Sequence, residues 1–160
     1  MKEVNGSSPT SNLIISVRDQ PDYLERAVNY FSSKWKIEPE LYRKSISDGI
    51  STAAPLPRWY LLLYNDEIIG SYGLIENDFM VRKDFTPWLC ALYVEDDQRG
   101  QELGASLLKH GRSEAGRLGF SNVYLCTDHI GFYEKYGWEF LGLEESEWGG
   151  MTRVYVSKSL

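Results

Sequence analysis

The sequence is poor in the residues that would build a metal site, a disulfide framework or a membrane span. It has two cysteines, Cys90 and Cys126, which make no disulfide framework and no plausible zinc site, so we predict no metal. Both lie in apolar, strand-like runs, where we expect reduced thiols packed in the core. No apolar run approaches the ~20 residues that a membrane-spanning helix needs. We therefore expect a protein that does not enter a membrane.

An excess of basic residues is also lacking. The chain has 17 Lys and Arg against 23 Asp and Glu, a net charge of −6. Binding a nucleic acid backbone requires a basic face, so we predict no nucleic acid partner. The acidic surplus suits a cationic substrate such as an amine, and it equally serves solubility.

The first twelve residues, MKEVNGSSPTSN, contain no apolar stretch of the kind found in a signal peptide. We expect residues 1–12 to form a disordered polar segment. Residues 13–160 show no linker and no internal repeat, which predicts one domain. A cytoplasmic location is the corresponding expectation.

Apolar periodicity predicts about seven strands and about four helices, an α/β fold. The expected strands are 13–17, 59–64, 68–75, 88–94, 121–127, 138–143 and 151–157. The expected helices begin at Pro21, at Ile37, at Gln98 and at Ile130, and the third, Gln98–Leu118, is the clearest. Residues 77–87 form a loop that is long enough to shape a site.

The segment between the strand 88–94 and the long helix suggests a phosphate-binding turn. It reads Arg99-Gly100-Gln101-Glu102-Leu103-Gly104-Ala105. The first turn of a helix offers unpaired N–H groups and the positive end of the helix dipole, and small residues let an anion approach them. Alone, this glycine pair is weak evidence, because Gly100 and Gly104 also suit a turn and a packing contact.

A second segment, Phe132-Tyr133-Glu134-Lys135-Tyr136-Gly137-Trp138, lies about thirty residues further on. With the first segment and the order of elements over residues 13–158, it resembles the GCN5-related N-acetyltransferase (GNAT) family. The resemblance implies the GNAT fold, in which a mixed central sheet is splayed after the third central strand. It also implies transfer of an acetyl group from acetyl-CoA to a primary amine of a small molecule or peptide, by direct attack in a ternary complex.

The resemblance assigns roles to particular residues. Tyr133 would be the acid that protonates the leaving thiolate. Pantetheine would pair with backbone groups of the strand 88–94, and the pyrophosphate would lie on the helix opening. The residues implied in cofactor binding are Leu92, Tyr93, Val94, Arg99, Gly100, Gln101, Glu102, Leu103, Gly104, Ala105, Tyr133 and Lys135.

Two positions depart from the family pattern. Glu102 replaces a glycine, and its carboxylate would repel a pyrophosphate unless the side chain points to solvent. The stretch Cys126-Thr127-Asp128-His129 lacks an asparagine that many members use to contact the cofactor.

The general base is not marked by any motif, because Pro87 and Trp88 stand where some members carry a glutamate. Glu76 and Asp78 are our candidates, while Asp84, Asp128, His129 and a chain of water molecules stay open. Aromatic residues, among them Trp35 and Phe79, would wall an acidic pocket for an amine cation.

Two other functions remain compatible with the sequence: a non-catalytic module that binds or senses acyl-CoA, and an interaction domain without cofactor. Self-association through the terminal strands, giving a homodimer, also stays open.

Overall fold

The computed structural model describes residues 12–100 and 102–160. The expected polar segment, apart from Asn12, and Gln101 lie outside the described residues. Seven strands form one sheet in the order β2-β3-β4-β5-β6-β8-β7. Neighbouring strands are antiparallel except β5 and β6, which run parallel. The predicted mixed sheet of seven strands is confirmed.

The elements follow the predicted order with boundaries shifted by one or two residues in most cases. The strands are β2 (Asn12–Ser16), β3 (Arg58–Tyr64), β4 (Glu67–Ile75), β5 (Trp88–Val94), β6 (Asn122–Thr127), β7 (Glu139–Glu145) and β8 (Met151–Lys158). The α-helices are α1 (Leu24–Trp35), α2 (Pro39–Ser51) and α3 (Leu103–Arg117). Short 3₁₀ segments lie at Pro21–Tyr23, Asp96–Gln98 and Tyr133–Tyr136.

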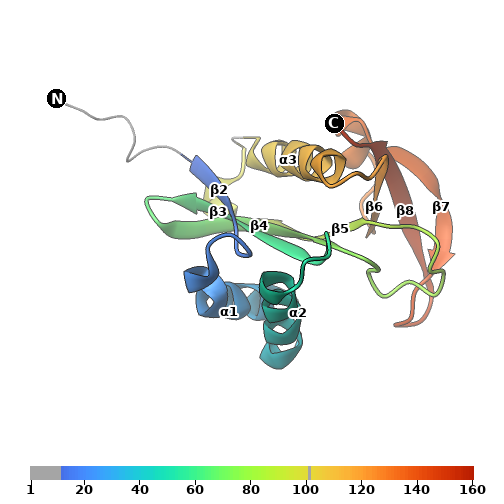
Figure 1. Cartoon of the computed structure of the whole chain (residues 1–160). Coiled ribbons are helices and arrows are strands. Elements are labelled where there is room, and N and C mark those ends of the chain that lie inside the picture. The colour runs from blue at the N-terminus through green and yellow to red at the C-terminus, as the bar shows by residue number, and fades with distance from the viewer. Residues whose placement is uncertain (1–11, 101) are drawn as a thin grey trace.

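The helices cover opposite faces of the sheet (Figure 1): α1 and α2 lie on one face and α3 on the other. A core cluster on the α1/α2 face gathers residues such as Phe31, Trp59 and Cys90. A larger cluster under α3 gathers residues such as Tyr72, Leu107 and Tyr133. This three-layer packing arises because alternate residues of each strand point to opposite faces.

Two of the predicted helices need correction. The long helix begins at Leu103 and not at Gln98, because Gly100 and Glu102 have φ values of 89° and 57°, which a right-handed helix excludes. The short helix expected at Ile130–Tyr136 is a 3₁₀ segment of four residues ended by Gly137 at φ 88°. The described chain therefore has three α-helices, not four.

Within residues 12–100 and 102–160, no helix is both long and apolar enough to cross a bilayer.

Candidate active site

The two parallel strands at the middle of the sheet part almost as soon as they meet. Over their described lengths, β5 and β6 pair at a single position, Trp88 opposite Tyr124. Next to this pair, the Tyr124 N–H donates a hydrogen bond of 3.0 Å to the Pro87 carbonyl. On its other side β6 pairs with β8 at six successive positions. The stretch of β5 after Trp88 therefore has one edge without a strand partner, as the predicted splaying requires.

A bulge in β5 accounts for the direction in which the strand bends. The register with β4 shifts between Ser71 and Gly73, and Ala91 has a φ of 52°. The Ser71 hydroxyl donates a hydrogen bond of 3.1 Å to the Ala91 carbonyl, which fixes the bulge from the neighbouring strand. A bulge bends its strand and increases the local twist, so β5 turns away from β6 at this point.

The parting leaves a cavity of about 1040 Å³ that runs through the sheet. Its lining includes Leu89 and Leu125 from the core under α3, together with Tyr42 and Cys90 from the core under α1 and α2. The cavity is therefore lined from both faces of the sheet, as a site where two reactants meet requires.

Tyr133 lies on the α3 side of this cavity. Its side chain is 9% exposed and belongs to the core cluster under α3. Burial raises the pKa of its hydroxyl, while a hydrogen bond with Thr127, at the end of β6, opposes that shift. Because the pKa of a free tyrosine is already about 10, the hydroxyl holds its proton at neutral pH.

The 3₁₀ segment that carries Tyr133 is itself held in place. Glu134 accepts hydrogen bonds from the Gly131 N–H at 2.9 Å and from the Tyr155 hydroxyl at 2.8 Å. Glu134 thus ties this segment to β8.

Asp78 lies on the opposite face of the sheet from Tyr133. Its carboxylate accepts a contact of 3.5 Å from the Cys126 thiol, and Cys126 packs with Trp88 against the face that the loop 77–87 covers. Burial raises the pKa of Asp78, although the Cys126 contact opposes the shift. Glu76 also lines the cavity but is exposed.

The loop that carries Asp78 is fixed by a distant turn. The Val81 N–H bonds to the Glu145 carbonyl at 3.1 Å, and the Glu147 N–H bonds to the Phe79 carbonyl at 2.7 Å. Within the loop, the Asn77 side chain accepts from the Met80 N–H at 2.8 Å. The loop is therefore a packed wall of the cavity.

The opening of α3 has the features of an anion site at the level of the backbone. Glu102 adopts the left-handed conformation at the N-cap, makes no side-chain capping bond and is exposed. The Glu102 carbonyl accepts a hydrogen bond from the Ser106 N–H at 3.1 Å, as expected at the start of a helix. A side chain added at Gly104 would lie 3.9 Å from the Phe132 ring, so this glycine keeps the space before the ring open.

The remaining residues predicted to bind the cofactor differ in their contacts and in whether they line the cavity. Arg99 donates from Nε to the Val94 carbonyl at 3.0 Å, so this carbonyl is already engaged. Leu92 lines the cavity. Tyr93 packs against α1, with its ring 4.7 Å from the Lys34 ammonium, and is not part of the cavity lining. Lys135 is exposed.

Aromatic rings wall the end of the cavity nearest α1 and α2. Trp35, Tyr42 and Trp59 line it, as does Phe79, whose ring lies 4.9 Å from that of Trp148. Three further lining residues were not predicted as site residues from the sequence: Cys126, Thr127 and Trp148. Each approaches the cavity only through long-range folding, so no local pattern marks it.

The other base candidates lie less favourably. His129 lines the cavity but is exposed. Asp84 is bonded to Arg82 at 2.7 Å, and neither Asp84 nor Asp128 is among the cavity-lining residues. In the described part of the chain, no three His, Cys, Asp or Glu side chains are grouped as metal ligands would be.

A family model described as "Acetyltransferase (GNAT) family" matches residues 21–138, which is more than half of the chain. Among curated proteins, the peptidyl-lysine N-acetyltransferase YjaB of Salmonella typhimurium is 29% identical over 105 residues. That match spans 65% of this chain and 66% of the relative's length.

Solved structures show the same fold at low sequence identity. The aminoglycoside 6'-acetyltransferase type Ii superposes with a TM-score of 0.69 at 20% identity, covering 92% of this chain and 97% of that one. A GNAT acetyltransferase from Elizabethkingia anophelis with acetyl-CoA bound gives 0.62 at 18% identity, with the same coverage. An aminoglycoside 6'-N-acetyltransferase complexed with coenzyme A gives 0.66 at 17% identity, again covering 92% and 97%.

Proposed function

This chain belongs to the acetyltransferase (GNAT) family, whose members are acetyl-CoA-dependent N-acetyltransferases, and we propose that it acetylates a primary amine of a small molecule or peptide by direct attack in a ternary complex. The observation that supports this most is the cavity through the sheet. It has a protonated tyrosine on one face of the sheet and a half-buried carboxylate on the other.

The thioester arm fits along the unpaired edge of β5. The backbone groups of Leu92 would pair with the pantetheine amides as a neighbouring strand does, because β6 does not occupy that edge. The Val94 carbonyl contributes less, since Arg99 already bonds to it.

The pyrophosphate fits the opening of α3. There Gly100, Leu103, Gly104 and Ala105 offer backbone N–H groups at the positive end of the helix dipole. The exposed side chain of Glu102 can stay in solvent, and Lys135 lies exposed on the neighbouring 3₁₀ segment. Gln101, outside the described residues, belongs to the same proposed set.

Tyr133 and Asp78 divide the proton transfers between the two faces. As the amine nitrogen bonds to the acyl carbon, a proton leaves the nitrogen for Asp78, directly or through water. When the C–S bond breaks, the sulfur takes the proton of the Tyr133 hydroxyl. Asp78 is a better base than an ordinary carboxylate because burial raises its pKa.

The acceptor would enter from the face of α1 and α2. The aromatic wall with Trp35 and Phe79, together with the carboxylates of Glu76 and Asp78, suits a cationic amine approaching its site of deprotonation. The comparisons include enzymes named for peptidyl-lysine and for aminoglycosides, and both substrates are cationic amines.

The test is release of free thiol from acetyl-CoA with a panel of amines: a lysine peptide, an aminoglycoside, a polyamine and glutamate. We expect turnover with at least one cationic amine and little with glutamate. A preference for glutamate would contradict the proposed acceptor pocket.

A thermal-shift titration with acetyl-CoA separates the remaining outcomes. Ligand at a hundred times its dissociation constant adds about 2.7 kcal/mol, which raises the melting temperature of a chain this long by about 5–10 °C. Such a shift without thiol release from any amine would indicate a non-catalytic acyl-CoA module. No shift and no thiol release would indicate an interaction domain.

A further inference from the structure

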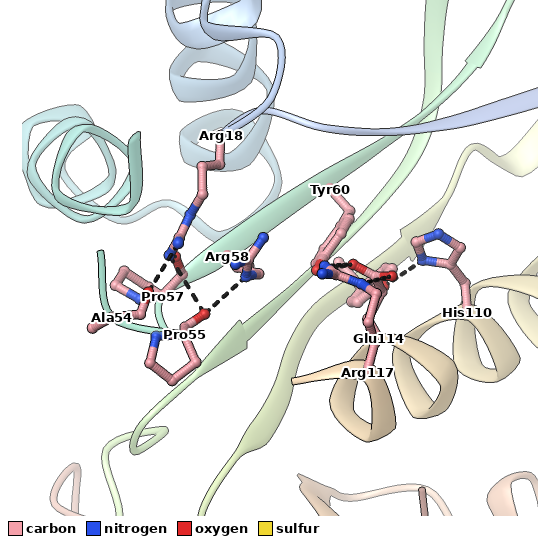
Figure 2. A network of polar contacts seen from close by, with 10 residues as sticks. Arg18, Ala54, Pro55, Pro57, Arg58, Tyr60, His110, Glu114 and Arg117 are labelled. Carbon is pink, nitrogen blue, oxygen red and sulfur yellow. Dashed lines mark hydrogen bonds and ion pairs between the residues drawn. The ribbon is translucent and has the colours of Figure 1, made fainter. Parts of the chain in front are cut away.

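A second cavity, of about 380 Å³, lies on the α3 face of the sheet and is separate from the proposed active site. Arg58 and Tyr60 of β3 line it, while Trp59 between them points to the other face and lines the large cavity. Figure 2 shows two groups of side chains around this cavity: Arg18 and Arg58 beside the segment 54–57, and Tyr60, His110, Glu114 and Arg117 beside α3.

The group on α3 is satisfied internally. Glu114 accepts from the Tyr60 hydroxyl at 2.8 Å and from two nitrogens of Arg117 at 2.8 and 3.1 Å. Next to it, the Tyr72 hydroxyl and Nδ1 of His110 lie 2.6 Å apart. The carboxylate of Glu114 is therefore committed to these partners and is a poor counter-ion for the other arginines.

The group at the end of β2 has donors left over. Arg18 donates to the Ala54 carbonyl at 2.8 Å and the Pro57 carbonyl at 3.0 Å, and Arg58 donates from Nε to the Pro55 carbonyl at 2.8 Å. Nevertheless, Arg18 Nε and Ser16 Oγ are buried and have no hydrogen-bond partner among the described residues. A buried donor without a partner is costly, so this corner lacks an acceptor.

The charges of the side chains that line the cavity also favour binding of an anion. Three arginines line it, Arg18, Arg58 and Arg117, against the two carboxylates of Asp19 and Glu114. Burial, and next the positive charge of Arg58, lower the pKa of Arg18, so the guanidinium groups destabilise one another. An anion bound between them would relieve both effects.

We propose that this cavity binds the oxyanion group of a small molecule, a phosphate or a carboxylate, at Ser16, Arg18 and Arg58. Its oxygens would pair with the Arg58 guanidinium and, after a small shift of the side chains that cover them, accept hydrogen bonds from Ser16 Oγ and Arg18 Nε. The site goes beyond the proposed acetyl transfer and does not depend on it. The segment that Arg18 and Arg58 hold also borders the large cavity through Leu56 and Pro57.

The experiment measures the melting temperature while chloride is replaced by inorganic phosphate or by malonate at constant ionic strength. Saturating coenzyme A is present, so that the opening of α3 is not free to take the probe. At ten times the dissociation constant we expect a saturable rise of about 3–6 °C with at least one probe. A response to phosphate alone identifies a phosphate ligand, and a response to malonate alone a carboxylate. No saturable rise beyond that in chloride overturns the proposal.

Two variants and one control locate the effect. Arg58→Gln should weaken the responding anion at least tenfold, and Ser16→Ala should weaken it severalfold, because each removes a donor. Lys109→Gln removes an exposed cation of α3 outside the cavity and should leave the affinity unchanged.

Unaltered anion affinity in Arg58→Gln would refute the assignment. If Arg58→Gln does not fold, unaltered anion affinity in Ser16→Ala would refute the assignment instead. The readout requires no turnover and can be repeated without coenzyme A, so it stands apart from the outcome of the acetyltransferase test.

Discussion

The two flanks of β6, a strand in the interior of the sheet, differ in how they are paired. Towards β8 the strand is paired at all six of its residues, and Val154 of β8, opposite Cys126, is fully buried. Towards β5 it pairs once and then leaves a cavity. The difference shows that one strand can anchor the fold on one side while it supplies a reaction site on the other. Substitutions at the open flank should therefore change turnover, and those at the closed flank should change stability.

The largest effect on the open flank is expected for Tyr133→Phe. Loss of the hydroxyl removes the acid for the leaving thiolate, and general acids contribute on the order of 10²–10⁴ to the rate. We expect kcat to fall about 10²–10³-fold, measured by thiol release, with the acetyl-CoA thermal shift retained. Full turnover in this variant would remove Tyr133 from the mechanism.

Asp78→Asn is expected to lower kcat/KM about 10²-fold at neutral pH, because the amine then loses its base. In the wild type, activity should fall as the pH drops through the pKa of Asp78, which burial places above that of an ordinary aspartate. The variant should lack this decline, and the deficit should shrink at high pH, where the amine is already neutral.

The unfolding free energies of the wild type and of Asp78→Asn give an independent check that the pKa of Asp78 is raised. Because the folded-state pKa is raised, ionising Asp78 destabilises the native state. The wild type should therefore lose stability relative to Asp78→Asn as the pH rises through that pKa. Glu76→Gln is the matched control, and an equal loss of activity there would move the base to Glu76.

The closed flank is tested by Val154→Ala. Removing two buried methyl groups costs about 0.8 kcal/mol each in transfer free energy, plus a cavity term, so we expect a loss of about 2 kcal/mol in unfolding free energy. Urea denaturation measures it. Turnover per folded molecule should change less than twofold, and a larger loss would mean that the two flanks are coupled.

Much of this organisation could be predicted from local sequence. Periodicity predicted the strands and their succession along the chain, and Tyr133 was selected through the resemblance of the segment 132–138 to the GNAT family. The start of α3 was predicted five residues too early, because a pattern of apolar spacing does not reveal that Glu102 takes a left-handed conformation. The bulge at Ala91 has no sequence signature either, since alanine seldom adopts a positive φ.

The environment of Asp78 could not be predicted from local sequence either, for a different reason. Its pKa depends on burial in a loop that the turn near Glu145 holds down, more than sixty residues away. The sequence could offer Asp78 as one of several carboxylates, and only the packing of the loop separates it from exposed Glu76.

Gly104→Val should weaken the binding of acetyl-CoA about tenfold, with a smaller change in kcat. The added side chain would occupy the space between the helix opening and the Phe132 ring, which a Cβ atom at this position already approaches to 3.9 Å. The dissociation constant from a thermal-shift or calorimetric titration measures this. Gly119→Ala is unsuitable as a control because of its positive φ, and Ser113→Val on the exposed face of α3 serves instead. Equal affinity in both variants would place the pyrophosphate elsewhere.

The smallest effect is expected for Trp148→Ala, at the outer edge of the aromatic wall. Trp148 is 72% exposed, so its removal leaves the core intact, and its ring lies against Phe79 near the cavity that also contains Glu76 and Asp78. A cation over an exposed ring gains about 0.5–1 kcal/mol, which corresponds to a two- to fivefold rise in KM for a cationic amine with kcat unchanged. A neutral hydroxylamine acceptor should show no such rise. If KM rose equally for both acceptors, the ring would act by shape and not by attraction of charge, and the acidic surplus of the chain would have no part in selecting the amine.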